Sequence, residues 1–262
     1  SLMQIGLIHQ AKGEYDTVYR YYEQALSIRE KAANNIKTAE TLFKLVVLQD
    51  FLEHESRKKD ATAYLMRLRE IRNREDFRIV ELQFRLAEAI IQKFSGDESS
   101  MSLAQVTFQQ FAYGEIIDYE LTVFSMLNYV EVLFERHVMK EEEDLLSELQ
   151  KSLEDLQLLV EAKKMSGVLL SALLLRGKLE MVLMNVNKAR SFFQEVVVQA
   201  KKTGHNRLAW QGEEELAKLS AYILGEKLQE MLEEEKDRYR SLQIDELRSY
   251  LNEIKKHLKL QA

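Results

Sequence analysis

The feature that most constrains the fold of this chain is the complete absence of proline among its 262 residues. At the usual frequency of about 5%, a chain of this length would contain roughly thirteen prolines. Glycine, the other residue that interrupts regular backbone, occurs only nine times. No stretch alternates apolar and polar residues between turn clusters, as half-buried strands do. Because proline and glycine are the main breakers of helices, the sequence predicts an all-α protein of long helices joined by short turns.

A recurring apolar pattern indicates five successive helix pairs. In the second helix of each pair, a small or branched residue is followed four residues later by an aromatic residue or leucine. A third residue of the pattern comes three positions after that. The starting residues are Val18, Ala61, Ala104, Leu145 and Ala189, which are separated by 43, 43, 41 and 44 positions. A fixed period of this length is typical of stacked structural repeats. The alternative is an irregular bundle of amphipathic helices, whose apolar residues also recur roughly.

The first and fifth units carry a more specific motif. In the first unit Gly6 precedes Tyr22 by sixteen residues, with the turn Gly13-Glu14-Tyr15 between them. In the fifth unit Gly177 precedes Phe193 by the same sixteen residues. A glycine in one helix lets the other helix approach closely, and the aromatic ring fills the adjacent gap. These residues resemble the tetratricopeptide repeat (TPR) family, in a long-helix form of about 42–44 residues per unit instead of the usual 34.

The middle units depart from the motif. Units three and four have Gln92 and Leu133 where the resemblance expects glycine, and they match mainly by period and apolar spacing. The predicted helix pairs are 1–12 with 15–33, 36–54 with 58–73, 76–95 with a helix ending near 112, 115–137 with 140–163, and 165–183 with 187–203. Ser99 or Ser100 is expected to cap the second helix of unit three, and Gly204 to terminate that of unit five.

The resemblance implies a right-handed α-α superhelix, a TPR-like solenoid of about five helix pairs with capping helices at its C-terminal end. Residues 1–204 would form the repeat array. Residues 205–262 would add a terminal repeat and the cap within the same solenoid. The stripe that suggests the cap has apolar residues at steps of three and four: Ile244, Leu247, Leu251, Ile254 and Leu258.

The sequence contains none of the common motifs for metal binding, phosphate binding or nucleophilic catalysis. There is no cysteine, and no two of the five histidines have the spacing of a helical metal pair. The histidines are His9, His54, His137, His205 and His257. Neither a glycine-rich phosphate loop nor a Gly-x-Ser-x-Gly elbow occurs. We therefore expect no enzymatic activity, no metal and no cofactor.

Charge and hydropathy narrow the choice of partners. The net charge of −6 argues against general nucleic-acid binding, which depends on neutralising phosphates. No apolar run approaches the length of a membrane span, and no signal peptide is visible. Together with the lack of cysteine, this predicts a cytoplasmic protein with a protein or peptide partner, without nucleic acid or membrane contact.

The resemblance also implies a binding surface, because the first helices of TPR pairs line a concave groove. Positions carried over from the family mix apolar side chains with both signs of charge, which suits an extended peptide or a helix. The candidate partner-binding residues are Gln10, Asp50, Glu53, Lys93, Glu131, Phe134 and Lys178.

Three functional hypotheses follow. The first is a non-catalytic scaffold that binds a peptide or helix in the groove. The second is the ligand- or partner-sensing region of a larger signalling or transcription regulator. The third is a structural module that self-associates through its repeat ends.

Overall fold

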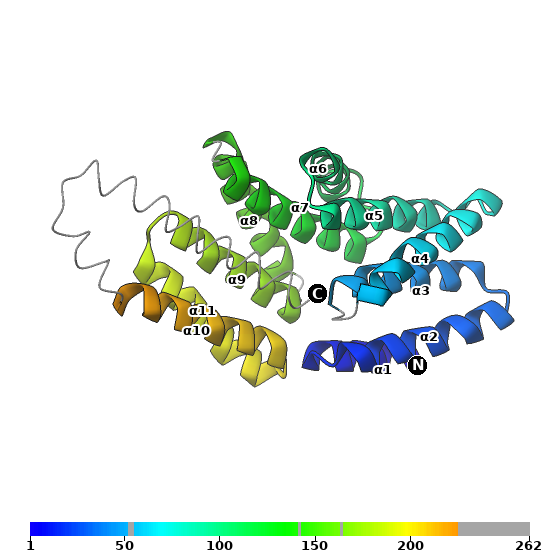
Figure 1. Cartoon of the computed structure of the whole chain (residues 1–262), viewed down its shortest axis with the longest axis horizontal. Coiled ribbons are helices and arrows are strands. Elements are labelled where there is room, and N and C mark those ends of the chain that lie inside the picture. Colours follow the sequence, from blue (N-terminus) through cyan, green and yellow to red (C-terminus); the bar gives the residue numbers. More distant parts are fainter. Residues whose placement is uncertain (52–54, 141–142, 163–164, 225–262) are drawn as a thin grey trace. The chain divides into compact units, whose positions relative to one another are not determined.

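The computed structural model describes residues 1–51, 55–140, 143–162 and 165–224. Within these ranges every regular element is helical, so the prediction of an all-α fold is confirmed (Figure 1). The elements are α1 (Leu2–Lys12), α2 (Tyr15–Lys31), α3 (Asn35–Leu48), the short 3₁₀ turn η1 (Gln49–Phe51), α4 (Glu55–Arg74), α5 (Arg78–Ser95), α6 (Glu98–Tyr113), α7 (Tyr119–Lys140), α8 (Glu143–Ala162), α9 (Ser166–Val182), α10 (Val186–Thr203) and α11 (Asn206–Leu224).

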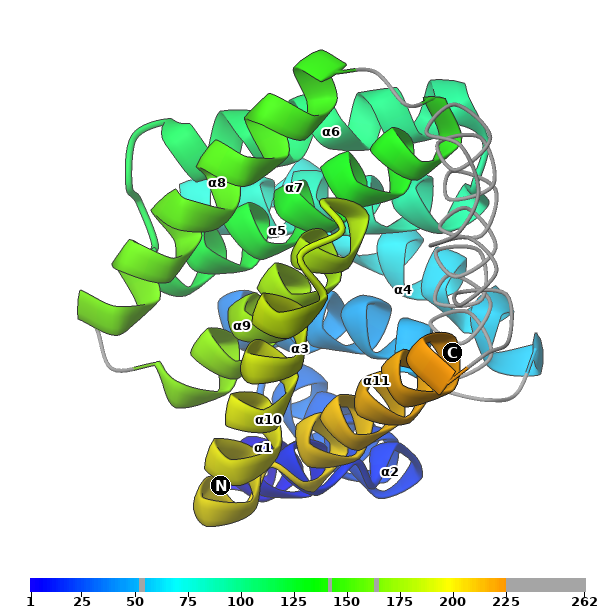
Figure 2. The same cartoon turned by 90° about the vertical axis from the view of Figure 1, so that its left-hand side faces the viewer.

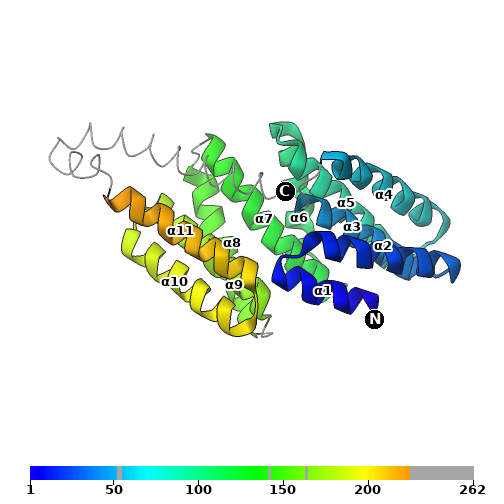
Figure 3. The same ribbon diagram turned by 60° about the horizontal axis from the view of Figure 1, so that its bottom comes forward.

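The helices pack in the order of the sequence. Each of α1, α3, α5 and α9 packs against the helix that follows it, and Tyr129 of α7 forms a hydrogen bond with Glu148 of α8. We call the odd-numbered helices first helices and the even-numbered helices second helices. The second helices α2, α4, α6 and α10 pack in turn on the next first helix, as Figures 1 and 3 show for α2 with α3 and for α10 with α11. This sequential packing is consistent with a helical repeat array.

The described residues divide into two compact units, 1–152 and 153–224. The boundary falls inside α8, so the first unit holds α1 to α7 and the start of α8. The second unit holds the end of α8 with α9, α10 and α11, the last three lying together in Figure 2. The division into an array of 1–204 and a terminal region of 205–262 stays a prediction, and the apolar stripe from Ile244 to Leu258 lies outside the described residues.

Residues one 43-residue period apart take equivalent positions in the core. Its five starting residues are all in the core, with exposed fractions of 0, 6, 0, 6 and 0% for Val18, Ala61, Ala104, Leu145 and Ala189. The next positions in four units, Tyr22, Phe108, Leu149 and Phe193, are also buried. The second of the five repeats departs from the pattern: Leu65 is half-buried and the neighbouring Tyr64 takes the core position.

The glycine motif has the expected steric cause in both repeats that carry it, the first and the fifth. A Cβ atom added to Gly6 would lie 2.5 Å from Cε1 of Tyr22. One added to Gly177 would lie 2.7 Å from Cδ1 of Phe193. Real Cβ contacts are never this short, so each close crossing of two helices requires glycine opposite the ring.

Some helix ends differ from the prediction. The helix expected over 36–54 ends at Leu48 and continues only as the 3₁₀ turn, and the helix expected from 115 begins at Tyr119. Asp97, instead of Ser99 or Ser100, caps α6, because its Oδ1 accepts a hydrogen bond from the Ser100 amide at 2.9 Å. That bond, with help from Ser95, lowers the pKa of Asp97 to about 2. Gly204 ends α10 with φ of 77°, as predicted.

Candidate functional site

Two of the predicted partner-binding residues of the first unit, Lys93 and Glu131, meet where α5 meets α7. Lys93 Nζ of α5 donates a hydrogen bond to Asn128 Oδ1 at 3.1 Å and forms an ion pair with Glu131. Lys93 is only 8% exposed, whereas the Glu131 side chain is 36% exposed. A buried ammonium group is tolerated only when it is paired and hydrogen-bonded. The cluster therefore holds α5 to α7, and Glu131 is its accessible end.

Two of the other predicted residues, Gln10 and Phe134, have side chains that the structure describes. Gln10 is half-buried on α1, where its Oε1 accepts a hydrogen bond from the Tyr22 hydroxyl at 3.4 Å. Phe134 is buried on α7. Asp50 lies in the 3₁₀ turn, and Glu53 falls outside the described residues. Whether any of them contacts a partner stays a prediction.

Lys178 belongs to the second unit and is also buried, with 3% of its surface exposed. Its Nζ lies 3.9 Å from Oε1 of Glu215 on α11, another buried side chain. Glu215 also approaches Lys218 at 3.5 Å. The position predicted to face a partner thus takes part in a buried charge cluster between α9 and α11.

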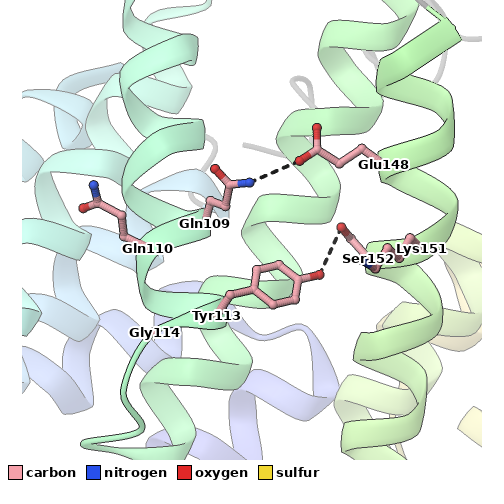
Figure 4. A pocket seen from close by; sticks show the side chains of 7 residues that line it. All are labelled: Gln109, Gln110, Tyr113, Gly114, Glu148, Lys151 and Ser152. Carbon is pink, nitrogen blue, oxygen red and sulfur yellow. Dashed lines mark hydrogen bonds between the residues drawn. The ribbon is translucent and has the colours of Figure 1, made fainter.

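An open cleft that the sequence did not reveal lies between the second helices α6 and α8 of the first unit (Figure 4). Its volume is about 540 Å³. Four residues near the end of α6 and three residues of α8 line it: Gln109, Gln110, Tyr113, Gly114, Glu148, Lys151 and Ser152. The lining carries amide, hydroxyl and charged groups beside one aromatic ring.

Two hydrogen bonds cross the cleft, and Figure 4 shows both. Gln109 Nε2 donates to Glu148 Oε1 at 3.2 Å, and the Tyr113 hydroxyl donates to Ser152 Oγ at 3.1 Å. Glu148 also accepts a hydrogen bond from Tyr129 of α7, and burial together with this carboxylate raises the pKa of Tyr129 above its ordinary value. The crossing bonds fix the two walls of the cleft at a defined separation.

The Tyr113 ring is held in place yet remains accessible. It meets the Tyr129 ring edge-on, with ring centroids 6.0 Å apart and an interplanar angle of 84°. Nevertheless 48% of Tyr113 is exposed. Beside it, Gln110 Oε1 accepts a hydrogen bond from Arg85 Nη2 at 2.8 Å, which orients the amide. A positioned aromatic ring flanked by oriented polar groups is a common way to bind a ligand.

Sequence reasoning could not find this cleft, because its walls come from helices 39 residues apart that meet only through the repeat packing. The one available signal was Tyr113 itself, an aromatic residue near the end of a helix and off the core stripe of Ala104 and Phe108.

Comparison with known proteins assigns no family. No protein-family model matches the chain, and a search of curated proteins finds no significant match. The TPR resemblance consequently rests on the motif, and the class of protein defined by the fold is an all-α array of sequentially packed helices.

Two further observations concern chemistry and membranes. Within the described ranges, no three histidine, aspartate or glutamate side chains gather as a metal ion would require. None of the helices in the same ranges has the length and apolar character needed to cross a membrane.

Proposed function

We propose that this chain is a non-catalytic protein-interaction scaffold, a TPR-like superhelical array that binds a peptide segment of a partner. The observation that carries the proposal is the open cleft between α6 and α8. Its volume of about 540 Å³ falls in the range of roughly 300–1,000 Å³ that is common for ligand sites.

The polar groups of the cleft suit a peptide main chain. Besides the bonds already described, the Gln109 amide keeps its oxygen as an acceptor, the Gln110 amide keeps its nitrogen as a donor, and the Ser152 hydroxyl keeps its hydrogen to donate. Peptide N–H and C=O groups need both kinds of partner. The half-exposed ring of Tyr113 offers an apolar contact for one peptide side chain. Glu148 and Lys151 supply one charge of each sign, so the cleft does not demand a strongly charged partner.

The cleft is a better binding surface than most of the positions carried over from the TPR family. Lys93 and Phe134 are buried, and Lys93 is occupied by Asn128 and Glu131. Of the predicted residues on the first helices, Gln10 and Glu131 remain partly accessible. We therefore place the main peptide contact in the cleft, with Glu131 as the candidate on the predicted groove.

The test selects ligands with the full chain and then maps them. A phage-displayed library of random peptides is panned on the immobilised protein, and the dissociation constants of selected peptides are measured by fluorescence anisotropy. Tyr113→Ala is expected to weaken binding roughly 30-fold, the effect of removing an interface hot spot. Trp210→Ala serves as the matched control, since Trp210 is also 48% exposed but lies on α11 in the second unit.

A third variant separates the two surfaces. If Glu131→Lys weakens binding and Tyr113→Ala does not, the peptide occupies the predicted groove and the assignment to the cleft is wrong. Failure to select any peptide that binds saturably would contradict the scaffold proposal itself.

A further inference from the structure

The second helix α6 is shorter than α2 and α4. We call residues equivalent when they lie at the same distance from the starting residues of their repeats, Val18, Ala61, Ala104 and Leu145. Counted in this way, α2 and α4 both end thirteen positions from the start, at Lys31 and Arg74, whereas α6 ends nine positions from it, at Tyr113. Gly114 follows, and both Tyr113 and Gly114 line the cleft (Figure 4). The cleft therefore opens at the end of α6, where α2 and α4 continue for another turn.

The seam between α2 and α4 shows what that last turn does. Near the middle of the seam, Glu23 of α2 accepts a hydrogen bond from the Tyr64 hydroxyl of α4 at 2.9 Å. Two turns further along α2, Glu30 forms an ion pair with Arg67 of α4. Glu30 is the next-to-last residue of α2. The final turn of this second helix thus supplies a carboxylate to a cation on the following second helix.

The seam between α6 and α8 contains the first of these two contacts. Gln109 of α6 is equivalent to Glu23, and it is hydrogen-bonded to Glu148 of α8 at 3.2 Å. Glu148 is in turn equivalent to Tyr64. Because one contact falls on equivalent residues in both seams, the seams can be compared position by position.

Of the second contact, the α6–α8 seam has only the cation. Lys151 of α8 is equivalent to Arg67 and lines the cleft. The residue equivalent to Glu30 is Ile116, an apolar residue beyond the end of α6 that is 59% exposed. Among the carboxylates that the structure describes, none forms an ion pair with Lys151. A cation that is paired in one seam is therefore unpaired at the equivalent position of the other.

Two carboxylates near the cleft already have partners. Glu148 accepts hydrogen bonds from Gln109 and from Tyr129. Glu115, which follows Gly114, lies 2.7 Å from Nη2 of Arg78 on α5. Of the two charged residues that line the cleft, Glu148 is thus engaged within the protein, and the ammonium group of Lys151 is the charge left for a ligand.

From this comparison we propose that the peptide bound in the α6–α8 cleft carries an acidic side chain, which pairs with Lys151 as Glu30 pairs with Arg67. The inference rests on the proposed peptide-binding function and adds the charge of the ligand to it. The half-exposed ring of Tyr113 lines the same cleft, so an apolar side chain of the peptide accompanies the acidic one.

The probe for the test is a positional-scanning library of hexapeptides, in which each pool has one fixed amino acid and mixed residues elsewhere. The peptides carry an uncharged dye at the N-terminus and an amide at the C-terminus, so every carboxylate belongs to a side chain. Binding to the full chain is followed by fluorescence anisotropy. Pools with fixed Glu or Asp are expected to bind about 5-fold more tightly than those with fixed Gln or Asn at low ionic strength. The preference should shrink in high salt, because salt screens an exposed ion pair.

Variants of the full chain locate the cation. Lys151→Gln should abolish the acidic preference, and Lys151→Glu should reverse it, so that pools with fixed Lys or Arg bind more tightly than those with fixed Glu. Lys31→Glu is the matched control, since Lys31 is also exposed at the end of a second helix but lies outside the cleft; it should keep the acidic preference. Circular dichroism verifies that each variant is folded.

Equal binding of acidic and neutral pools by the parent chain overturns the inference, and so does an acidic preference that survives Lys151→Gln. In both cases the proposed function stands, because peptides still bind. Saturable binding by none of the pools contradicts the proposed function and this inference with it.

Discussion

The pairs α1–α2 and α9–α10 share one crossing motif and differ in what covers their first helix. Gly6 faces Tyr22 in one pair as Gly177 faces Phe193 in the other. Yet only two residues of α1 are buried, whereas ten residues of α9 are. The motif thus fixes how two helices cross and leaves open whether the first of them faces a neighbour or solvent.

The difference reverses the usual relation between polarity and burial. Leu7 of α1 is 46% exposed, while Lys178 at the equivalent position of α9 is 3% exposed. The lysine is buried because α11 covers α9 and supplies Glu215. Polarity at one position of a repeat is therefore a poor guide to its exposure, since the neighbouring pair decides it.

The largest expected effect comes from breaking the charge pair of the covered helix. Glu215→Leu should lower the free energy of unfolding by about 3–5 kcal/mol, because it removes a buried partner of Lys178. The double variant Lys178→Leu with Glu215→Leu should recover most of that loss. Leu7→Lys, which introduces a lysine at the position of the exposed helix that is equivalent to Lys178, should change stability by less than about 0.5 kcal/mol. Urea unfolding followed by Trp210 fluorescence and circular dichroism measures all three, and a Leu7→Lys loss as large as that of Glu215→Leu would refute the comparison.

Overpacking the crossings tests the part that the two pairs share. Ala189→Trp and Val18→Trp each enlarge a fully buried residue at the same register position. Each should cost about 1–3 kcal/mol in thermal or urea unfolding. Val198→Trp is the control, because Val198 is 62% exposed on α10. If Ala189→Trp is as stable as Val198→Trp, the shared register is wrong.

Placing the tyrosine of the first crossing into the second should have an effect of similar size. The Tyr22 hydroxyl donates to Gln10, and the position equivalent to Gln10 in α9 is Met181, which is 1% exposed. Phe193→Tyr would bury a hydroxyl group beside a thioether and should cost about 1–3 kcal/mol. Adding Met181→Gln should restore part of this stability. No recovery in a double-mutant cycle would show that the two sites are not equivalent.

The smallest effect is a difference in alkaline sensitivity. Burial, followed by the charge of Glu40, raises the pKa of Tyr22 to about 12 from its usual value near 10. The neutral phenol therefore stabilises the fold fully below pH 10, and this contribution is lost as the pH rises from 10 to 12. Tyr22→Phe should lose less stability over that interval than the parent chain. Phe193 cannot ionise, so Phe193→Leu should leave the slope of stability against pH unchanged.

The sequence predicted local features well because they depend on neighbours within one helix pair. Apolar spacing located the pairs, and Gly204 ended α10 as expected. Cap choice was harder: Asp97, Ser99 and Ser100 can all accept a hydrogen bond from a free amide, and only the backbone path selects Asp97. The helix expected to reach residue 54 changes to a 3₁₀ turn after Leu48, although no proline or glycine marks the position.

The candidate site was less predictable, because it depends on contacts between pairs. The sequence identified Lys93 and Glu131 as two of the candidate partner-binding residues, and in the structure they form an ion pair with each other. It did not reveal that Lys93 and Lys178 are buried, since that requires knowing which helix covers each one. The walls of the α6–α8 cleft were missed for the same reason.

The hydrogen bonds that join neighbouring second helices have a mechanical consequence. Tyr113 reaches from α6 to Ser152 of α8, and Tyr64 of α4 similarly meets Tyr19 of α2 at 2.9 Å. A bond of this kind can exchange its partner for water at a net cost of about 0.5–1.5 kcal/mol, whereas prying apart a glycine–aromatic crossing exposes an entire ring. Under tension, these links between second helices should therefore yield first and re-form on release, so that this side of the first unit extends and recovers elastically while its helix pairs stay intact.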